Sequence, residues 1–398
     1  MPGPSPQGEE QWRAFVDALA EAGSEVHRAA AAGRTPVEQT QLTQSLVWTL
    51  LGELTSLALA DRDHPDWMPL LNGTWRRYNA NADATYAVAY IRGSGTYRVS
   101  GRRGTTRIVH LQVGTGTLGI GDPQRMSILA DLNVDDCEIA DDGTFEVILS
   151  PRRPDGYVGA WLQLDASRED SFALVRQVAY DWTSEIDAQL SIRRIDQPIA
   201  KTEIAGAELA ANLVLVAQSV RDDCLAMLDV MAGQLSLSES NQLADVSSSF
   251  PAIAGQAYTH GLIELSDDDV WVAECQIPPG CPYWSVQLMD HAYSALDAMN
   301  TQASLNGHSA VADPDGVYRI VVGAVDPGLA NWLDTGGQQR VQIRFRWYSA
   351  DAPEISTSVV SRAELDTWLP ADTARVNETE RRAALTERAI GLQWRRRW

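Results

Sequence analysis

The sequence is almost without lysine. Lys201 is the single lysine among 32 basic residues, and the others are arginines. No glycine-rich loop precedes Lys201, so neither a phosphate-binding P-loop nor Schiff-base chemistry is expected. With 53 acidic residues the formal net charge is -21. Because nucleic-acid binding depends on basic side chains that neutralise phosphates, nucleic acid and anionic membranes are not expected partners.

Long apolar runs and targeting segments are also missing. The longest apolar stretch, residues 46–60, is interrupted by Glu53 and falls short of the roughly 18 residues that span a bilayer. Residues 1–11 lack the basic start and apolar stretch of a signal peptide. We therefore expect a cytoplasmic protein without membrane insertion. The four cysteines lack CxxC spacing, so free thiols are expected rather than disulfides or zinc ligands: Cys137, Cys224, Cys275 and Cys281.

Familiar catalytic motifs are scarce. The sequence contains no GxSxG elbow and no HExxH or HxH pair, and its histidines are scattered. His110 on a predicted strand and His291 beside Asp290 are the better candidates. Gly114, Gly116 and Gly119 match GxGxxG after a predicted strand, but Pro123 and its neighbours would break the helix that a dinucleotide site needs. We do not expect a dinucleotide cofactor.

Helical periodicity occurs at both ends and in the centre. Residues 1–65 predict a helical pair, whose second helix begins at Thr35 with Pro36 at its first position and Glu38 completing a capping box. Residues 201–248 predict a helical connector. The end of the chain predicts a helix that begins at Asn377.

Between these helices the pattern changes to short strands rich in valine, isoleucine, tyrosine and threonine, separated by glycine-containing turns. This spacing favours sandwiches or barrels over alternating strands and helices. The fold class expected is mainly β with helical additions (α+β). We expect five segments: helices at 1–65, a β-sandwich at 66–200, a connector at 201–248, a second sandwich at 249–352 and a helical tail at 353–398.

Several pieces of the second β region resemble the domain family of unknown function DUF1214. They occur in order: Pro282–Asp290, Asn306–Ser309, Asp315–Tyr318, Asp326–Gly328, Asn331–Leu333 and Arg344–Tyr348. Upstream, residues 81–86 are similar to the Asn-x-Asp-Thr-x-Tyr signature of the companion family DUF1254, with Ala84 in place of threonine. The resemblance implies two jelly-roll-like antiparallel sandwiches and supplies no activity. Similar actinobacterial proteins stand in lipid, steroid or terpenoid gene neighbourhoods, which is an analogy only.

Candidate site residues come from these segments. Asn81, Asp83 and Tyr86 carry hydrogen-bonding groups that can converge on one strand face or loop. Trp284 and Asp290 are six residues apart and are expected on one face of a strand. Asp83, Asp290 and Tyr86 are the candidate catalytic groups. The candidate substrate-binding residues are Asn81, Trp284, Trp182 and His291. The simpler alternative is that Asp83 and Asp290 only cap turns.

The resulting hypothesis is an enzyme of lyase or isomerase type, without a metal or other cofactor. It would bind a small, largely apolar hydroxylated molecule between the sandwiches and perform hydration, elimination or cyclisation by acid–base chemistry. A non-catalytic binding or interaction module remains open, as does a homo-oligomer. A third alternative makes Asp222 and Asp223 ligands of Mg²⁺ in an enzyme acting on a prenyl diphosphate.

Overall fold

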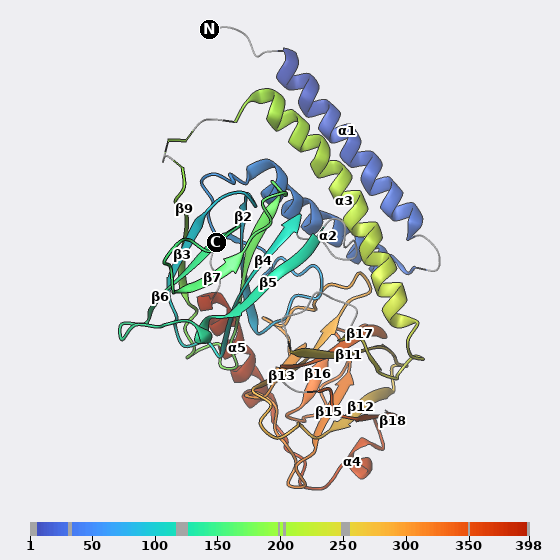
Figure 1. Ribbon diagram of the computed structural model, residues 1–398. Helices are drawn as coiled ribbons and strands as arrows, with labels where there is room; N and C mark the ends of the chain where they lie inside the picture. The colour runs from blue at the N-terminus through green and yellow to red at the C-terminus, as the bar shows by residue number, and fades with distance from the viewer. Residues whose placement is uncertain are drawn as a thin grey trace.

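The computed structural model describes residues 6–30, 34–116, 126–197, 200–201, 204–247, 255–348 and 351–395. Two β domains lie one above the other in Figure 1, and two long helices lie to one side of the upper domain, one of which reaches down to the lower domain. Gly119 of the glycine motif lies outside the described residues. The expected fold class, mainly β with helical additions, is confirmed.

The helical layer consists of α1 (Pro6–Ala29), α2 (Pro36–Glu53), the π-helix η1 (Leu54–Leu59) and α3 (Gly206–Leu235). The predicted start of α2 is confirmed, because the Thr35 side chain accepts from the Glu38 backbone and the Glu38 side chain accepts from the Thr35 backbone. α1 and α3 lie side by side (Figure 1). Phe15, Val216 and Val220 form part of the apolar contact between them.

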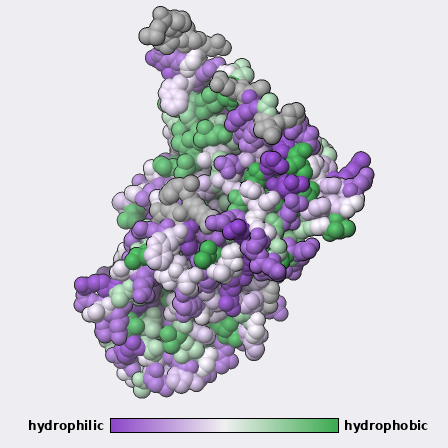
Figure 2. Space-filling model, turned by 90° about the vertical axis from the view of Figure 1, so that its left-hand side faces the viewer, coloured by the Kyte–Doolittle hydropathy of each residue, from purple (hydrophilic) through white to green (hydrophobic). Residues whose placement is uncertain are grey.

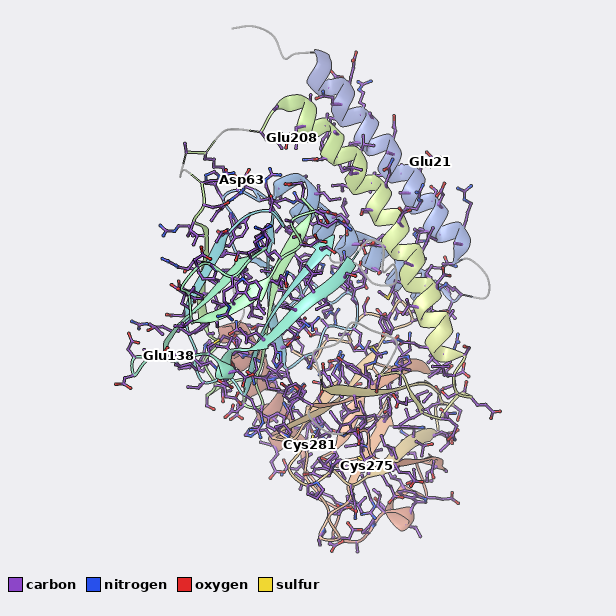
Figure 3. The ribbon with its side chains drawn as sticks, in the orientation of Figure 1. Glu21, Asp63, Glu138, Glu208, Cys275 and Cys281 are labelled. Atoms are coloured by element: carbon purple, nitrogen blue, oxygen red, sulfur yellow. The ribbon has the colours of Figure 1, made fainter. Side chains whose placement is uncertain are left out.

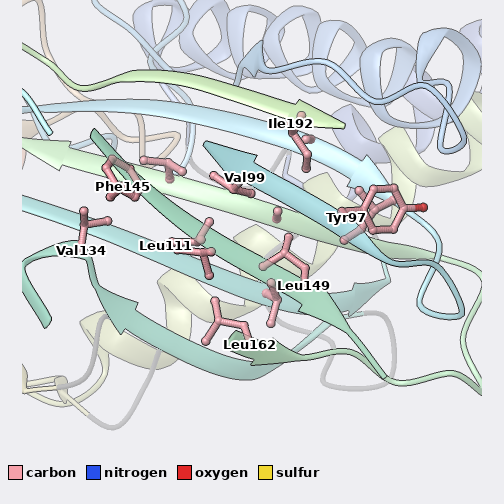
Figure 4. Close-up of a cluster of buried hydrophobic side chains, with 14 of the residues drawn as sticks. Tyr97, Val99, Leu111, Val134, Phe145, Leu149, Leu162 and Ile192 are labelled. Carbon is pink, nitrogen blue, oxygen red and sulfur yellow. The ribbon is translucent and has the colours of Figure 1, made fainter. Parts of the chain in front are cut away.

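The first sandwich contains two sheets, with strand orders β1-β2-β8-β4-β5 and β7-β6-β3-β9. A short 3-10 helix, η2 (Val134–Asp136), follows β5. The strands are β1 (Met68–Pro69), β2 (Ala84–Ile91), β3 (Tyr97–Arg102), β4 (Ile108–Gly116), β5 (Met126–Asn133), β6 (Thr144–Ser150), β7 (Ala160–Gln163), β8 (Ser171–Val178) and β9 (Gln189–Arg194). Figure 4 shows part of the core between the sheets, where Val99, Leu111 and Leu149 are almost fully buried.

The second sandwich also contains two sheets, ordered β10-β11-β17-β13-β14 and β16-β15-β12-β18. Its strands are β10 (Ala244–Asp245), β11 (Gln256–Glu264), β12 (Asp269–Cys275), β13 (Tyr283–Met289), β14 (Ser304–Asn306), β15 (Tyr318–Gly323), β16 (Trp332–Asp334), β17 (Arg340–Tyr348) and β18 (Ile355–Ser361). β18 pairs with β12. The sandwich therefore extends beyond residue 352, where its end was expected.

The two sandwiches are topological copies of one another. Each strand of the first has a counterpart nine places later in the chain, from β1 and β10 to β9 and β18, and the strand orders agree in both sheets. The agreement includes the parallel pairs, β6 with β7 and β15 with β16. Every other strand pair is antiparallel in both halves.

Two helices close the chain, α4 (Leu365–Trp368) and α5 (Glu378–Arg395). Asn377 caps α5 as predicted, accepting from the backbone of Thr379 and Glu380. α5 returns from the second sandwich to the first (Figure 1). Gly391 approaches the backbone of Trp182 so closely that an added Cβ would stand 2.9 Å from it.

The surface is mostly polar, with apolar side chains gathered along the helical part in Figure 2. Among the described residues, no helix combines the length and apolarity that a membrane span requires. All four cysteines are free thiols, as expected. Cys275 and Cys281 both lie in the second sandwich (Figure 3).

Candidate functional site

One face of the second sandwich is polar and nevertheless buried. Along β17 the side chains alternate: Ile343, Phe345 and Trp347 enter the sandwich core, whereas Arg344 and Arg346 point out of it. The outward face meets the first sandwich and the end of α3. We call this set the polar layer: Tyr258, His260, Tyr283, Ser285, Gln287, Gln342, Arg344, Arg346 and Tyr348. All except the half-buried Tyr348 are at most 9% exposed.

Asp83 lies at one end of the polar layer and is 2% exposed. Tyr283 donates to its Oδ2 at 2.7 Å, while Trp182 and Asn306 donate to its Oδ1 at 2.9 and 2.7 Å. Burial raises the pKa of Asp83, although these three hydrogen bonds oppose the shift. Asn81 donates to the Tyr283 hydroxyl at 2.8 Å. This arrangement joins the two sandwiches.

The C-terminal helix secures the same junction. Arg395 donates to the backbone carbonyl of Asp83 at 2.7 Å and pairs with Asp187 at 2.9 Å, and both members of this pair are buried. Arg388 lies over the Trp182 ring, 4.6 Å from its centroid. Trp182 is therefore held between α5 and Asp83.

Asp290 does not meet Asp83. Asp290 follows the end of β13, where it accepts from the backbone of Ala292 and Ser294 at 2.8 and 2.9 Å. Tyr283, the partner of Asp83, begins the same strand, and seven extended residues span roughly 23 Å. Burial raises the pKa of Asp290 to about 6. The structure thus places the two candidate acids at opposite ends of the polar layer.

The remaining predicted residues are dispersed. Trp284 points into the core of the second sandwich, where it forms an edge contact with Tyr318. Trp284 and Asp290 therefore do not form the shared ligand-binding face that was expected. His291 lies 3.3 Å from Glu38 at the start of α2. The Tyr86 hydroxyl accepts from the Asn81 backbone at 3.2 Å.

Asp222 and Asp223 point to different partners. Asp222 pairs with Arg221 at the surface, whereas the buried Asp223 accepts from the Tyr78 hydroxyl at 3.1 Å. Within the described segments no group of three or more histidine, cysteine or acidic side chains could hold a metal ion. The two aspartates do not converge on a common site.

Asp223 instead belongs to a buried cluster between α3 and the end of α2. Arg77 lies 3.7 Å from Glu53 and 3.6 Å from Asp223, and its side chain is 1% exposed. Burial, together with the Asp223 carboxylate, raises the pKa of Glu53 to about 8. Glu53 therefore holds a proton at neutral pH. The sequence predicted neither this buried cluster nor the π-helix η1, which begins directly after Glu53.

A histidine chain crosses from one sandwich to the other. His110 on β4 lies with Nδ1 2.5 Å from Asp131 on β5 and with Nε2 2.7 Å from the Tyr348 hydroxyl on β17. Because a carboxylate accepts hydrogen bonds, Nδ1 carries the proton and Nε2 accepts from the phenol of Tyr348. Gln112 donates to the second Asp131 oxygen at 2.6 Å. Sequence analysis singled out His110 but neither of its partners.

Three non-glycine residues with left-handed backbones border the polar layer: Tyr78, Asn79 and Tyr293, with φ of 57°, 54° and 62°. The Asn79 backbone donates to the Tyr293 carbonyl at 2.8 Å, so the three lie together. Arg346 donates to the backbone and side-chain oxygens of Asn79 at 2.9 and 2.8 Å. Such conformations are unfavourable and tend to occur at functional sites.

A small cavity of about 40 Å³ lies beside Asn81, at the junction of the two sandwiches. This space suits roughly two or three water molecules. Its lining is mainly apolar: Ala80, Ala82, Ala84, Ala295, Leu296, Ala298, Met299 and Leu392, with Asn72, Gly73, Arg76, Asn81 and Thr85.

These features define the class: a protein of two duplicated β-sandwiches whose facing sheets enclose a polar layer. A family model described as a protein of unknown function (DUF1214) matches residues 270–352, which confirms the resemblance for the C-terminal part. A crystal structure of an uncharacterized protein from Burkholderia cenocepacia is similar, with 29% identity over 89% of this chain and 97% of that one and a TM-score of 0.80. The VPA0106 protein from Vibrio parahaemolyticus shares 11% identity over 80% of this chain and 99% of that one, with a TM-score of 0.44. No curated protein matches the chain.

Proposed function

We propose that the protein binds a small, largely apolar molecule between its two sandwiches and transforms it by acid–base chemistry at Tyr348. The observation that carries the proposal is the Asp131–His110–Tyr348 chain, with its contacts of 2.5 and 2.7 Å. Asp131 orients the imidazole, and Nε2 can take the phenolic proton as Tyr348 removes a proton from the substrate, then return it. Elimination, hydration and isomerisation all need such a step.

Asp83 fits this chemistry less well than expected. Both of its oxygens already accept from buried donors, and it does not line the cavity beside Asn81. We therefore assign Asp83 to holding the sandwiches together. The likeness of residues 81–86 to the DUF1254 signature then concerns the domain junction, because Asn81 and Asp83 both bind Tyr283.

Apolar and adaptable surroundings support a ligand of this kind. Met227 and Met231 of α3 pack with Met289 and Tyr293 against the polar layer. Unbranched methionine side chains adjust to differently shaped partners at low cost. An apolar molecule that bears one polar group could contact the methionine side chains with its apolar part and the polar layer with its polar group.

The test combines binding with product analysis. Sterols, terpenoids and fatty acids are titrated against intrinsic tryptophan fluorescence, and each positive mixture is examined by mass spectrometry. We expect Tyr348→Phe and His110→Asn to retain binding and to lower turnover about 100-fold or more. Tyr157→Phe removes a hydroxyl bonded to Glu146 in the first sandwich and should leave turnover unchanged. Full turnover in Tyr348→Phe would contradict the proposal.

A non-catalytic binding module is a second candidate, supported by the hydrogen bonds that occupy both oxygens of Asp83 and Oδ1 of Asp290. In that case the same titrations give saturable quenching, every ligand is recovered unaltered, and His110→Asn changes affinity alone.

A further inference from the structure

A tyrosine and an arginine stand opposite one another at the same register in both sandwiches. Tyr86 on β2 pairs with Arg176 on β8, and Tyr258 on β11 pairs with Arg346 on β17. The phenol of Tyr258 is close enough to Arg176, Arg344 and Arg346 for all three to lower its pKa against the effect of burial. Tyr86 also packs in one cluster with Tyr283 and Tyr348 of the second sandwich. The two pairs therefore face each other across the domain junction and bring three guanidinium groups together.

The guanidinium groups of the second sandwich are deeply buried. Arg344 and Arg346 are 3% and 4% exposed. Arg344 donates to Gln234 of α3 at 2.6 Å, and its guanidinium carbon lies 5.2 and 5.6 Å from the ring centroids of Tyr293 and Tyr258. These contacts orient the Arg344 guanidinium group within the polar layer. Burying a charge in this way costs several kcal/mol unless an opposite charge compensates.

Hydrogen-bond donors in the same layer lack acceptors. In the part of the chain that the structure describes, Arg346 forms no ion pair with a carboxylate, and its Nη1 has no hydrogen-bond partner. Nε2 of Gln234 is likewise a donor without a partner, although this residue is 3% exposed. Native proteins leave few buried polar atoms unsatisfied. Two such donors beside the buried arginines indicate a missing acceptor with negative charge.

We propose that the polar layer binds an oxyanion of the ligand, a carboxylate or phosphate group, between Arg344, Arg346 and the facing Arg176. This inference rests on the proposed function, because it gives the ligand of the same layer its charged end. The planar guanidinium fork matches both kinds of oxyanion. Tyr348 follows Arg346 by two residues on the same face of β17, roughly 7 Å along the strand. A ligand anchored on Arg346 would thus present its neighbouring carbons to Tyr348.

The experiment compares octanoate, octyl phosphate and octanol, which share one alkyl chain and differ in charge. Calorimetric titration and thermal unfolding of the wild-type protein at constant ionic strength measure binding of each. We expect saturable binding and a raised Tm with at least one anion and neither effect with octanol. Preference for octanoate identifies a carboxylate site, and preference for octyl phosphate a phosphate site. Equal effects of all three probes, or no binding of either anion, would overturn the proposal.

Arginine variants test where the anion binds. Arg346→Gln is expected to weaken anion binding about 10- to 100-fold through loss of charged hydrogen bonds. Arg340→Gln removes the same charge from the same strand, where Arg340 pairs with Glu264 and Glu38 outside the layer, and should change nothing. If Arg346→Gln does not fold, Arg176→Gln at the half-buried facing position serves instead. Unchanged affinity in the folded variant places the anion elsewhere and refutes the site.

The two proposals fail in distinguishable ways. Octanoate that binds wild type and not Arg346→Gln, together with turnover that is indifferent to Tyr348→Phe, retains the anion site and removes the catalytic assignment. Turnover of an uncharged substrate that depends on Tyr348, without binding of either anionic probe, does the opposite.

Discussion

Tyr283 of the second sandwich donates a 2.7 Å hydrogen bond to Asp83 of the first, and both side chains are buried. Asp83→Ala would leave Tyr283, Trp182 and Asn306 without their common acceptor. We expect it to lower the free energy of unfolding by about 3 kcal/mol, measured by urea denaturation. Asp372→Ala at an exposed turn is the control. A wild-type midpoint for Asp83→Ala would show that this contact does not stabilise the junction.

Arg395→Ala should destabilise the protein strongly, because it leaves the buried Asp187 carboxylate unpaired and the Asp83 carbonyl without its donor. Removing one partner of a buried pair costs about 3–5 kcal/mol. Arg382→Ala, on the exposed side of the same helix, breaks a surface pair with Glu378 and should change stability by less than about 0.5 kcal/mol. Similar unfolding curves for the two variants would argue against a structural role for the end of α5.

Glu53 should make stability fall as pH rises. Its pKa is about 8 in the folded protein against an ordinary 4.5, so between these values the folded state holds a proton that the unfolded chain has lost. Stability is then greatest below about pH 5 for this group and declines up to pH 8, by at most about 1.4 kcal/mol per pH unit. Glu53→Gln should flatten this slope in urea titrations at pH 5, 6, 7 and 8. Parallel slopes for variant and wild type would contradict the shifted pKa.

Asp290 should affect stability at a lower pH than Glu53 does. Its pKa of about 6 lies above the ordinary 3.8, so its contribution declines as pH rises from about 4 to 6 and is constant above that. Asp290→Asn keeps an oxygen for the Ala292 and Ser294 donors and removes the titration. The difference in unfolding free energy between variant and wild type should therefore change below pH 6 only. A change between pH 7 and 8 would assign the titration to another group.

Much of the fold could be predicted because local signals were consistent. The Thr35 capping box marked the start of α2, and short runs rich in β-branched and aromatic residues between turn signals marked β2, β4, β13 and β17. β8 was missed, although residues 171–178 are buried except Arg176 and the equally buried β4 was predicted. β18 was missed as well, since its few apolar residues gave a weak pattern beside the expected helical tail.

The candidate site was harder to predict. In Arg-Phe-Arg-Trp-Tyr, residues 344–348, the alternation correctly separates two faces, but a polar face ordinarily meets water. The first sandwich and the end of α3, both far from these residues in the sequence, bury the two arginines. For the same reason the sequence indicated His110 as a candidate on its strand but could not predict its contact with Tyr348, 238 positions later.

The duplication makes this chain comparable to a homodimer fused into one polypeptide. In a true dimer, every mutation at an isologous interface appears twice. Here the copies can diverge: Arg176 has His110 as its neighbour on β4, whereas Arg346, at the equivalent register, has Ser285 on β13. A single chain can therefore place an imidazole on one half and a small hydroxyl at the equivalent register of the other, so that the two faces of the polar layer differ in chemistry.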